Sequence, residues 1–146
     1  MSIALDEAKK AFSEDEIPVG AIVVKDKTVI GRGYNTVEKL NNPLLHAEIN
    51  ALNDAFLTVN NKFLYGCDIY VTLEPCVMCI GAIINSRLDN LYFGAFQPKF
   101  GACGSVFNIP ELDILNHSVN VYSGILSDES EILLEEYFIK KRKINR

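Results

Sequence analysis

The sequence predicts an α/β protein, a three-layer α/β/α sandwich around a mixed sheet of about five strands. Two observations support this fold class. Segments with strand composition alternate with segments whose apolar residues recur at helical spacing. Near the start of the chain, two strand segments are joined by a short polar turn, as in a hairpin. A hairpin followed by alternating strands and helices favours a mixed sheet with helices on both faces.

The chain has 146 residues, enough to bury a core in one domain. No repeat, low-complexity tract or Pro/Gly-rich linker divides it, so we expect one domain over residues 1–146. Pro75 is expected at the first position of a helix, where its missing N–H costs nothing. The predicted helices cover residues 3–12, 46–57 and 75–85, and a last helix begins at about residue 128. The predicted strands cover 17–24 and 28–34, which form the hairpin, and 67–73, 88–93 and 119–122. The last helix is expected to turn Ile132, Leu133, Tyr137 and Phe138 inward.

Composition and charge argue against several classes of protein. No apolar run approaches the roughly 20 residues that cross a bilayer, and the first residues lack the pattern of a signal peptide. We therefore expect a soluble, cytoplasmic protein without a membrane partner. The net charge of −5 argues against a broad nucleic-acid-binding surface. A local basic patch nevertheless ends the chain, formed by Lys140, Lys141, Arg142, Lys143 and Arg146.

Two short motifs carry the chemistry, His46-Ala47-Glu48 and Pro75-Cys76-Val77-Met78-Cys79. A catalytic zinc ion needs three protein ligands and one position open to water. Two cysteines three residues apart at a helix start lie on one face, and the helix start favours their thiolate forms. His46 can supply the third ligand from another helix start. The motifs predict one zinc ion held by His46, Cys76 and Cys79.

Glu48 is the predicted catalytic residue. Zn²⁺, two thiolates and a neutral imidazole sum to zero charge, so this ligand set acidifies water less than an all-histidine site. A neighbouring carboxylate can compensate by taking the proton of the water and returning it to the substrate. H-x-E followed by P-C-x-x-C is the signature of zinc deaminases that act on nucleobases. We therefore expect a hydrolase that releases ammonia from a cyclic amidine.

Three other interpretations of the motifs stay open. A redox dithiol would leave His46 and Glu48 unexplained. A structural zinc site would need a fourth ligand, for which His117 and Cys103 are available. A catalytically inactive zinc-binding RNA module is a further alternative, against which the intact Glu48 argues.

Beyond these motifs, the sequence resembles the cytidine deaminase-like superfamily, and most closely the bacterial tRNA-specific adenosine deaminases. The resemblance runs almost end to end. It is carried by Glu16–Ala21, Gly33-Tyr34-Asn35, His46–Ile49, Tyr70–Cys79, Ser86-Arg87, Phe93-Gly94-Ala95, Lys99, Gly101-Ala102, Gly104-Ser105, Gly124-Ile125-Leu126, Tyr137-Phe138 and Lys141-Arg142.

The resemblance implies hydrolytic conversion of the wobble adenosine of a tRNA anticodon to inosine. It also implies a homodimer that holds one zinc ion per subunit and binds the anticodon stem-loop across both subunits. Asn35 would then hydrogen-bond the flipped nucleoside, the Ala47 N–H would read the base edge, and the Glu74 carbonyl would receive the leaving amine. The implied RNA contacts are Lys99, Tyr137, Phe138, Lys141 and Arg142, aromatic and basic residues suited to a single-stranded loop.

For several of these residues a plainer interpretation stays open. Asn35 fits a turn, Lys99 fits a solvated surface, and Tyr137 and Phe138 fit a helix face followed by a frayed end. The alternative substrate is a free nucleobase or nucleoside, such as guanine or cytosine. Gln97 stands where the family usually carries Asp near the nucleic acid, while Asn42 and Leu44-Leu45 replace other residues before the zinc histidine. These changes predict a more apolar pocket rim.

Overall fold

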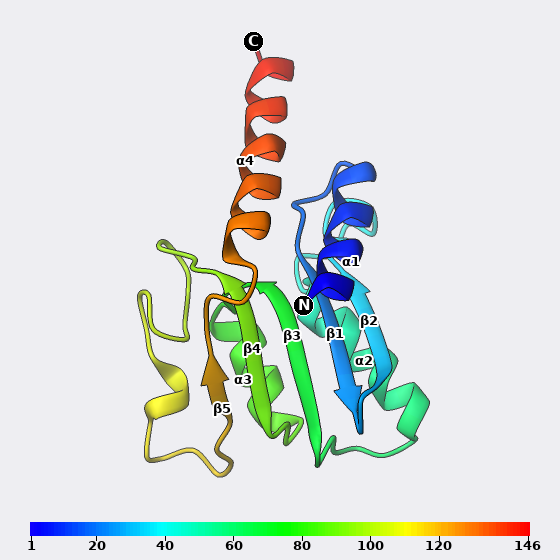
Figure 1. The fold of residues 1–146 in the computed structure, drawn as a ribbon, viewed down its shortest axis with the longest axis vertical. Coiled ribbons are helices and arrows are strands. Elements are labelled where there is room, and N and C mark those ends of the chain that lie inside the picture. The colour runs from blue at the N-terminus through cyan, green and yellow to red at the C-terminus, as the bar shows by residue number, and fades with distance from the viewer.

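The computed structural model describes residues 1–146 and contains one mixed sheet of five strands in the order β2-β1-β3-β4-β5 (Figure 1). β1 runs antiparallel to both β2 and β3, whereas β4 and β5 run parallel to β3. This arrangement confirms the predicted α/β fold. The strands are β1 (Gly20–Lys25), β2 (Thr28–Tyr34), β3 (Cys67–Leu73), β4 (Asn90–Ala95) and β5 (Asn120–Tyr122).

Four α-helices surround the sheet, and none is long and apolar enough to cross a membrane. In Figure 1, α2 and α3 lie behind the sheet, α1 lies in front of β1, and α4 rises beyond the upper end of the sheet. The helices are α1 (Ser2–Ser13), α2 (Ala47–Val59), α3 (Val77–Asn85) and α4 (Ser127–Ile144), with a short 3₁₀ turn at Ile109–Glu111.

The main core fills the space between the sheet and the helices α2 and α3. Alternate strand residues such as Val23, Ile69 and Phe93 point to that side and are fully buried against Ala51 of α2 and Ile83 of α3. The small alanines along α2 allow close approach to β2, where a Cβ on Gly33 would collide with the backbone nitrogen of Ala51. This packing fixes the N-termini of both helices relative to the ends of the strands.

The front face of β3, β4 and β5 carries no helix over its lower part (Figure 1). Tyr70, Tyr92 and Tyr122 are in register there and stack across the three strands, with ring centroids 4.5 and 4.9 Å apart. Beside them, the Asn90 amide donates to Asp68 and the Asn120 amide donates to Asn90. In place of a helix, these two side-chain ladders tie the parallel half of the sheet together.

Several local expectations were wrong. β1 begins at Gly20 and not at residue 17, because Pro18 has no N–H for the ladder. Pro75 precedes the helix rather than opening it, since α3 begins at Val77 and Cys76 is its extended N-cap.

In α4, Tyr137 is buried as predicted and Leu133 is half-buried, but Ile132 and Phe138 are 55% and 47% exposed. The inward side of α4 is the stripe of Ser130, Leu133, Leu134 and Tyr137 at helical spacing, and Ile132 and Phe138 lie off that stripe.

Candidate active site and metal centre

His46, Cys76 and Cys79 meet where two helices begin. His46 is the N-cap of α2 and Cys76 the N-cap of α3, and both have extended backbones that turn their side chains out of the helix end. Their ligand atoms, with the Cys79 sulfur, all lie within 4.8 Å of one another. The His46 Nδ1 atom is 3.7 Å from the Cys76 Sγ and 3.5 Å from the Cys79 Sγ. Two sulfurs and one imidazole around a common point form a candidate metal site with room for a fourth ligand.

No further side chain of the fold completes a closed, four-ligand site. The His117 Nε2 atom lies 2.6 Å from the Leu88 carbonyl oxygen, and Cys103 is outside the group of converging ligand atoms. A structural zinc site built with either residue therefore finds no support in the geometry.

The pKa values of the two thiols are shifted in opposite directions. A hydrogen bond from Cys79 lowers the pKa of Cys76 to about 4, and His46 adds to this effect. The same bond to Cys76, together with burial, raises the pKa of Cys79. Cys76 is therefore the more readily ionised thiol of the two. A bound cation would favour the thiolate form of both, because thiolate is the form that ligates metal.

Glu48 lies directly beside this centre, in the first turn of α2 and only 4% exposed. Burial raises the pKa of its carboxyl to about 7, against the lowering effect of neighbouring His46. A carboxyl with a pKa near the working pH can both accept and release a proton, which general acid–base catalysis needs. The arrangement can therefore activate a water molecule and protonate a leaving group.

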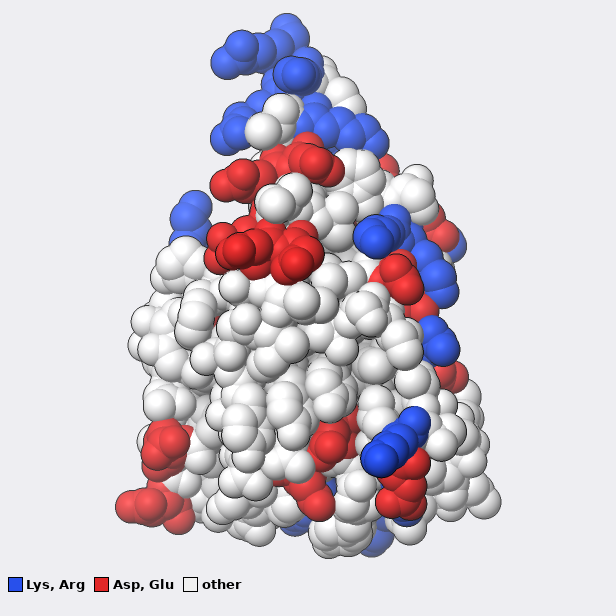
Figure 2. All heavy atoms as spheres, in the orientation of Figure 1, with Lys and Arg blue, Asp and Glu red and all other residues white.

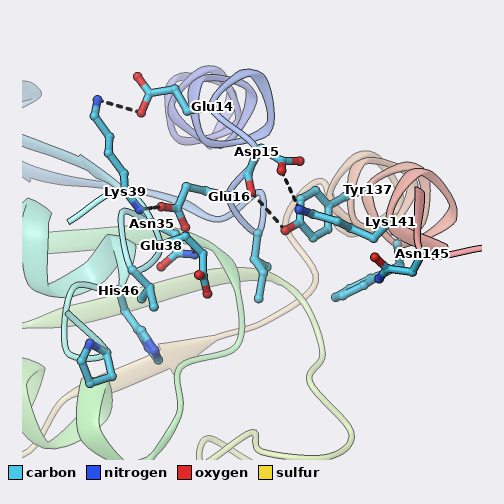
Figure 3. A pocket seen from close by; sticks show the side chains of 14 residues that line it. Glu14, Asp15, Glu16, Asn35, Glu38, Lys39, His46, Tyr137, Lys141 and Asn145 are labelled. Atoms are coloured by element: carbon cyan, nitrogen blue, oxygen red, sulfur yellow. Dashed lines mark hydrogen bonds and ion pairs between the residues drawn. The ribbon is translucent and has the colours of Figure 1, made fainter. Parts of the chain in front are cut away.

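A pocket of about 790 Å³ opens beside His46, within the size range of small-molecule sites (Figure 3). Its walls come from the segment after α1, the loop between β2 and α2, and the last turns of α4. The predicted substrate residues Asn35, Tyr137, Phe138 and Lys141 line it together with His46. Residues separated by about a hundred positions are thus brought to one cavity.

The comparisons with known proteins agree with this site. The family model of the MafB19-like deaminases matches residues 1–143. A tRNA-specific adenosine deaminase of Aquifex aeolicus is 46% identical over 142 residues, which are 97% of this chain and 93% of that protein. A protein of the same name from Rickettsia bellii is 43% identical over 97% of this chain and 99% of its own length. The chain belongs to the tRNA-specific adenosine deaminase family.

Solved structures distinguish branches of this fold. A structure from a study of A-to-I editing by tRNA:A34 deaminases matches with a TM-score of 0.89 and 42% identity, covering 92% of this chain and 97% of that one. The guanine deaminase of Nitrosomonas europaea matches with a TM-score of 0.77 and 28% identity, covering 93% of this chain and 81% of that one. Both comparisons confirm the cytidine deaminase-like fold, and the tRNA-specific adenosine deaminase structure agrees better over the whole chain.

The other residues predicted from the likeness to tRNA-specific adenosine deaminases are spread around the site. Ala47 is fully buried at the first position of α2, next to His46. Lys99 and Arg142 are exposed and do not line the pocket beside His46.

Glu74 is 2% exposed, and its side chain forms hydrogen bonds to a loop that the sequence did not suggest. The carboxylate accepts hydrogen bonds from the backbone N–H groups of Gln97, Cys103 and Ser105 and from the Ser105 hydroxyl. Glu74 therefore holds the loop of residues 96–107 against the start of α3.

Two further polar residues beside the site were missed, the buried Glu16 and the half-buried Asn50. Glu16 is fully buried and accepts hydrogen bonds from the Asn35 side chain and the Lys39 N–H. The Asn50 amide donates to the Tyr34 carbonyl and the Thr36 hydroxyl, fixing the loop before His46. The only signal in the sequence is their position beside motifs of the family, since Glu16 opens the first strand motif and Asn50 follows His46–Ile49.

Proposed function

We propose that this protein converts the wobble adenosine of a tRNA anticodon to inosine and that His46, Cys76 and Cys79 hold a catalytic zinc ion. The proposal is carried by one observation: a three-ligand cluster beside the buried Glu48, whose His46 also lines a pocket with Asn35 and the aromatic residues of α4. The donor set of two sulfurs and one nitrogen suits zinc. The names of the relatives, tRNA-specific adenosine deaminases, supply the substrate.

The proposed mechanism assigns the proton transfers to Glu48. A zinc ion at this site would supply Lewis-acid activation of the attacking water. Glu48 removes one proton from that water as oxygen attacks C6 of adenine and delivers it to N1. It then takes the remaining proton from the new C6 hydroxyl and passes it to the departing amine as the C6–N6 bond breaks, so that adenosine and water give inosine and ammonia. Burial favours this shuttle, because the carboxyl changes its protonation state near neutral pH.

Substrate binding is assigned to residues around the pocket. We propose that Asn35, the Ala47 N–H and the Glu74 carbonyl contact the target nucleoside, and that Tyr137, Phe138, Lys141, Arg142 and Lys99 contact the RNA. Tyr137 and Phe138 pack edge to face at 5.3 Å, and Lys141 lies 5.5 Å from the Tyr137 ring. The exposed Phe138 ring, backed by the buried Tyr137, suits an unstacked base, and Lys141, which is paired with Asp15 at 2.6 Å, would exchange that partner for a phosphate.

A direct assay tests the proposed substrate against a free base. The zinc-loaded protein is incubated with anticodon stem-loops carrying adenosine at the wobble position, and separately with guanine and cytosine. We expect inosine in the RNA and no ammonia from the free bases. Ammonia from guanine without inosine in any stem-loop would overturn the choice of substrate in favour of the alternative, a free-base deaminase.

Removing the residues after Phe138 is expected to weaken RNA binding and flatten its dependence on salt, while zinc content is unchanged. Figure 2 shows Lys and Arg gathered at the free end of α4, above a band of acidic side chains. Each lost phosphate contact reduces the slope of log K against log salt by roughly 0.7 to 0.9. Titrations of stem-loop RNA at several salt concentrations measure this slope.

The matched control replaces Lys25 and Lys27 with Gln. Both are exposed near the hairpin turn, at the end of the sheet opposite α4 (Figure 1). This control should keep the wild-type slope. An unchanged slope in the truncated protein would move the docking surface away from α4.

We also propose that the protein is a homodimer, assembled through the apolar rim of the loop at residues 96–107. Phe96, Phe100 and Phe107 are 52%, 66% and 53% exposed, although Glu74 holds this loop rigidly. Exposed apolar side chains gathered on one loop mark an interaction surface. Light scattering should give twice the chain mass of 16.3 kDa, and Phe100→Glu should reduce it to the monomer mass. A wild-type monomer would contradict the proposal.

We propose that residues 1–146 act as one deaminase domain in the cytoplasm. The five strands share one sheet, which supports the first part. The tRNA substrate of the named relatives and the four free cysteines, two of them proposed zinc ligands, support a reducing compartment in which tRNA is processed.

A further inference from the structure

Asn35 holds the one buried side-chain oxygen of the protein without a hydrogen-bond partner. The residue is 6% exposed, and its Oδ1 atom is the unsatisfied acceptor. Asn35 also lines the pocket beside His46 (Figure 3). Leaving a buried polar atom unsatisfied costs free energy, so such an atom facing a cavity indicates where a ligand binds.

The orientation of the Asn35 amide is set by Glu16. The Glu16 Oε1 atom accepts the Lys39 N–H at 2.6 Å, and its Oε2 atom accepts the Asn35 Nδ2 at 3.3 Å. Both carboxylate oxygens are acceptors, so only the nitrogen end of the Asn35 amide can face them. Glu16 is fully buried, which keeps water from replacing either partner. The oxygen end of Asn35 is thereby left for the pocket.

We infer that Glu16 is a positioning residue, which holds the Asn35 amide so that its oxygen accepts a hydrogen bond from the ribose 2′-hydroxyl of the target nucleotide. This inference rests on the proposed function. An adenosine inside an RNA chain offers two kinds of hydrogen-bond donor, the N6 amine and the 2′-hydroxyl. The N6 amine leaves from the carbon attacked at the metal centre, so the 2′-hydroxyl is the donor that remains for Asn35. Glu16 would thus make the pocket selective for RNA at the edited position.

Three stem-loops that differ only at the edited nucleotide test whether Asn35 presents a hydrogen-bond acceptor to the 2′ position. They carry a 2′-hydroxyl, a 2′-hydrogen or a 2′-fluorine, which is an acceptor and no donor. In the wild type we expect kcat/KM to fall roughly tenfold from hydroxyl to hydrogen, because the Asn35 oxygen loses its partner. The fluorine substrate should be slower still, since two acceptors then face each other.

The variant Glu16→Gln should change this order. The new amide keeps an oxygen for the Lys39 N–H and turns a nitrogen toward Asn35, which then reverses its own amide to avoid two facing donors. The pocket now receives the Asn35 nitrogen, so the fluorine substrate should react at least as fast as the hydrogen one. Zinc content should stay at the wild-type value. Glu14→Gln is the matched control, because Glu14 binds Tyr34 and Lys39 at the exposed rim and does not touch Asn35; it should keep the wild-type order.

The outcomes separate the inference from the function on which it rests. A Glu16→Gln variant with the wild-type order, or a wild type that converts all three stem-loops equally, would overturn the role of Glu16. Asn35→Ala, which removes the acceptor and keeps the Glu16 side chain with its bond to the Lys39 N–H, should bring the hydroxyl-to-hydrogen ratio near one even if Glu16→Gln does not fold. A wild type that converts no RNA stem-loop would instead overturn the proposed function.

Discussion

Replacing Glu48 with Gln is expected to reduce the rate of deamination by roughly a thousandfold or more while the protein keeps its metal. General acid–base groups typically contribute factors of about 10² to 10⁴, and here one carboxylate serves both the attacking water and the departing amine. The substitution keeps the shape of the side chain at a site that is 4% exposed, so the fold should be retained. Inosine formation under single-turnover conditions and zinc content by mass spectrometry are the two measurements.

Glu48→Ala and Asp26→Asn complete the experiment. Asp26 is an exposed acid in the hairpin turn, where Asn tolerates the positive φ of 49°. Its substitution removes one negative charge and should leave the rate unchanged. If Glu48→Ala deaminated RNA at the wild-type rate, the proton shuttle would be wrong, even with zinc present.

Cys76→Ser and Cys79→Ser should each lose bound zinc and activity together. A serine hydroxyl stays protonated at neutral pH and offers the ion no thiolate, and one ligand of three cannot be spared. Chelation of the wild type should have the same effect, reversed by added zinc. Metal content and stem-loop deamination are measured on the same samples.

Cys67→Ser is the matched control for the cysteine variants. Cys67 is buried at the start of β3, while the proposed ligands lie beyond the end of that strand. It should keep full metal occupancy, even if the protein becomes less stable. Stoichiometric zinc in both Cys76→Ser and Cys79→Ser would exclude the proposed ligand set.

Much of the fold could be predicted from local patterns. The bounds of β2 and β3 agree with the expected strands, because turns with clear polar signals flank them. The gathering of His46, Cys76 and Cys79 was predictable because each cysteine and histidine lies at the start of a helix. The exposure of Ile132 and Phe138 was not, since it depends on which side of α4 packs against the rest of the fold.

The hydrogen bonds that support the site also could not be predicted from sequence patterns. Glu16 and Asn35 are 19 positions apart, and Glu74 and Ser105 are 31 positions apart. No helical or strand period links residues at such separations, so only the packed structure reveals the pairs. A buried acid next to a motif looks the same in the sequence whether it binds substrate, orients a neighbour or holds a loop.

The stacked tyrosines of the open sheet face have a practical consequence for spectroscopy. The chain has no Trp and six Tyr, and Tyr70, Tyr92 and Tyr122 lie in van der Waals stacks on β3, β4 and β5. Near-ultraviolet circular dichroism will therefore be dominated by coupled phenol rings on the side of the sheet away from α2 and α3. This signal follows the integrity of the parallel strands and is insensitive to the metal ligands, which makes it a built-in indicator of folding for protein samples stripped of their ion.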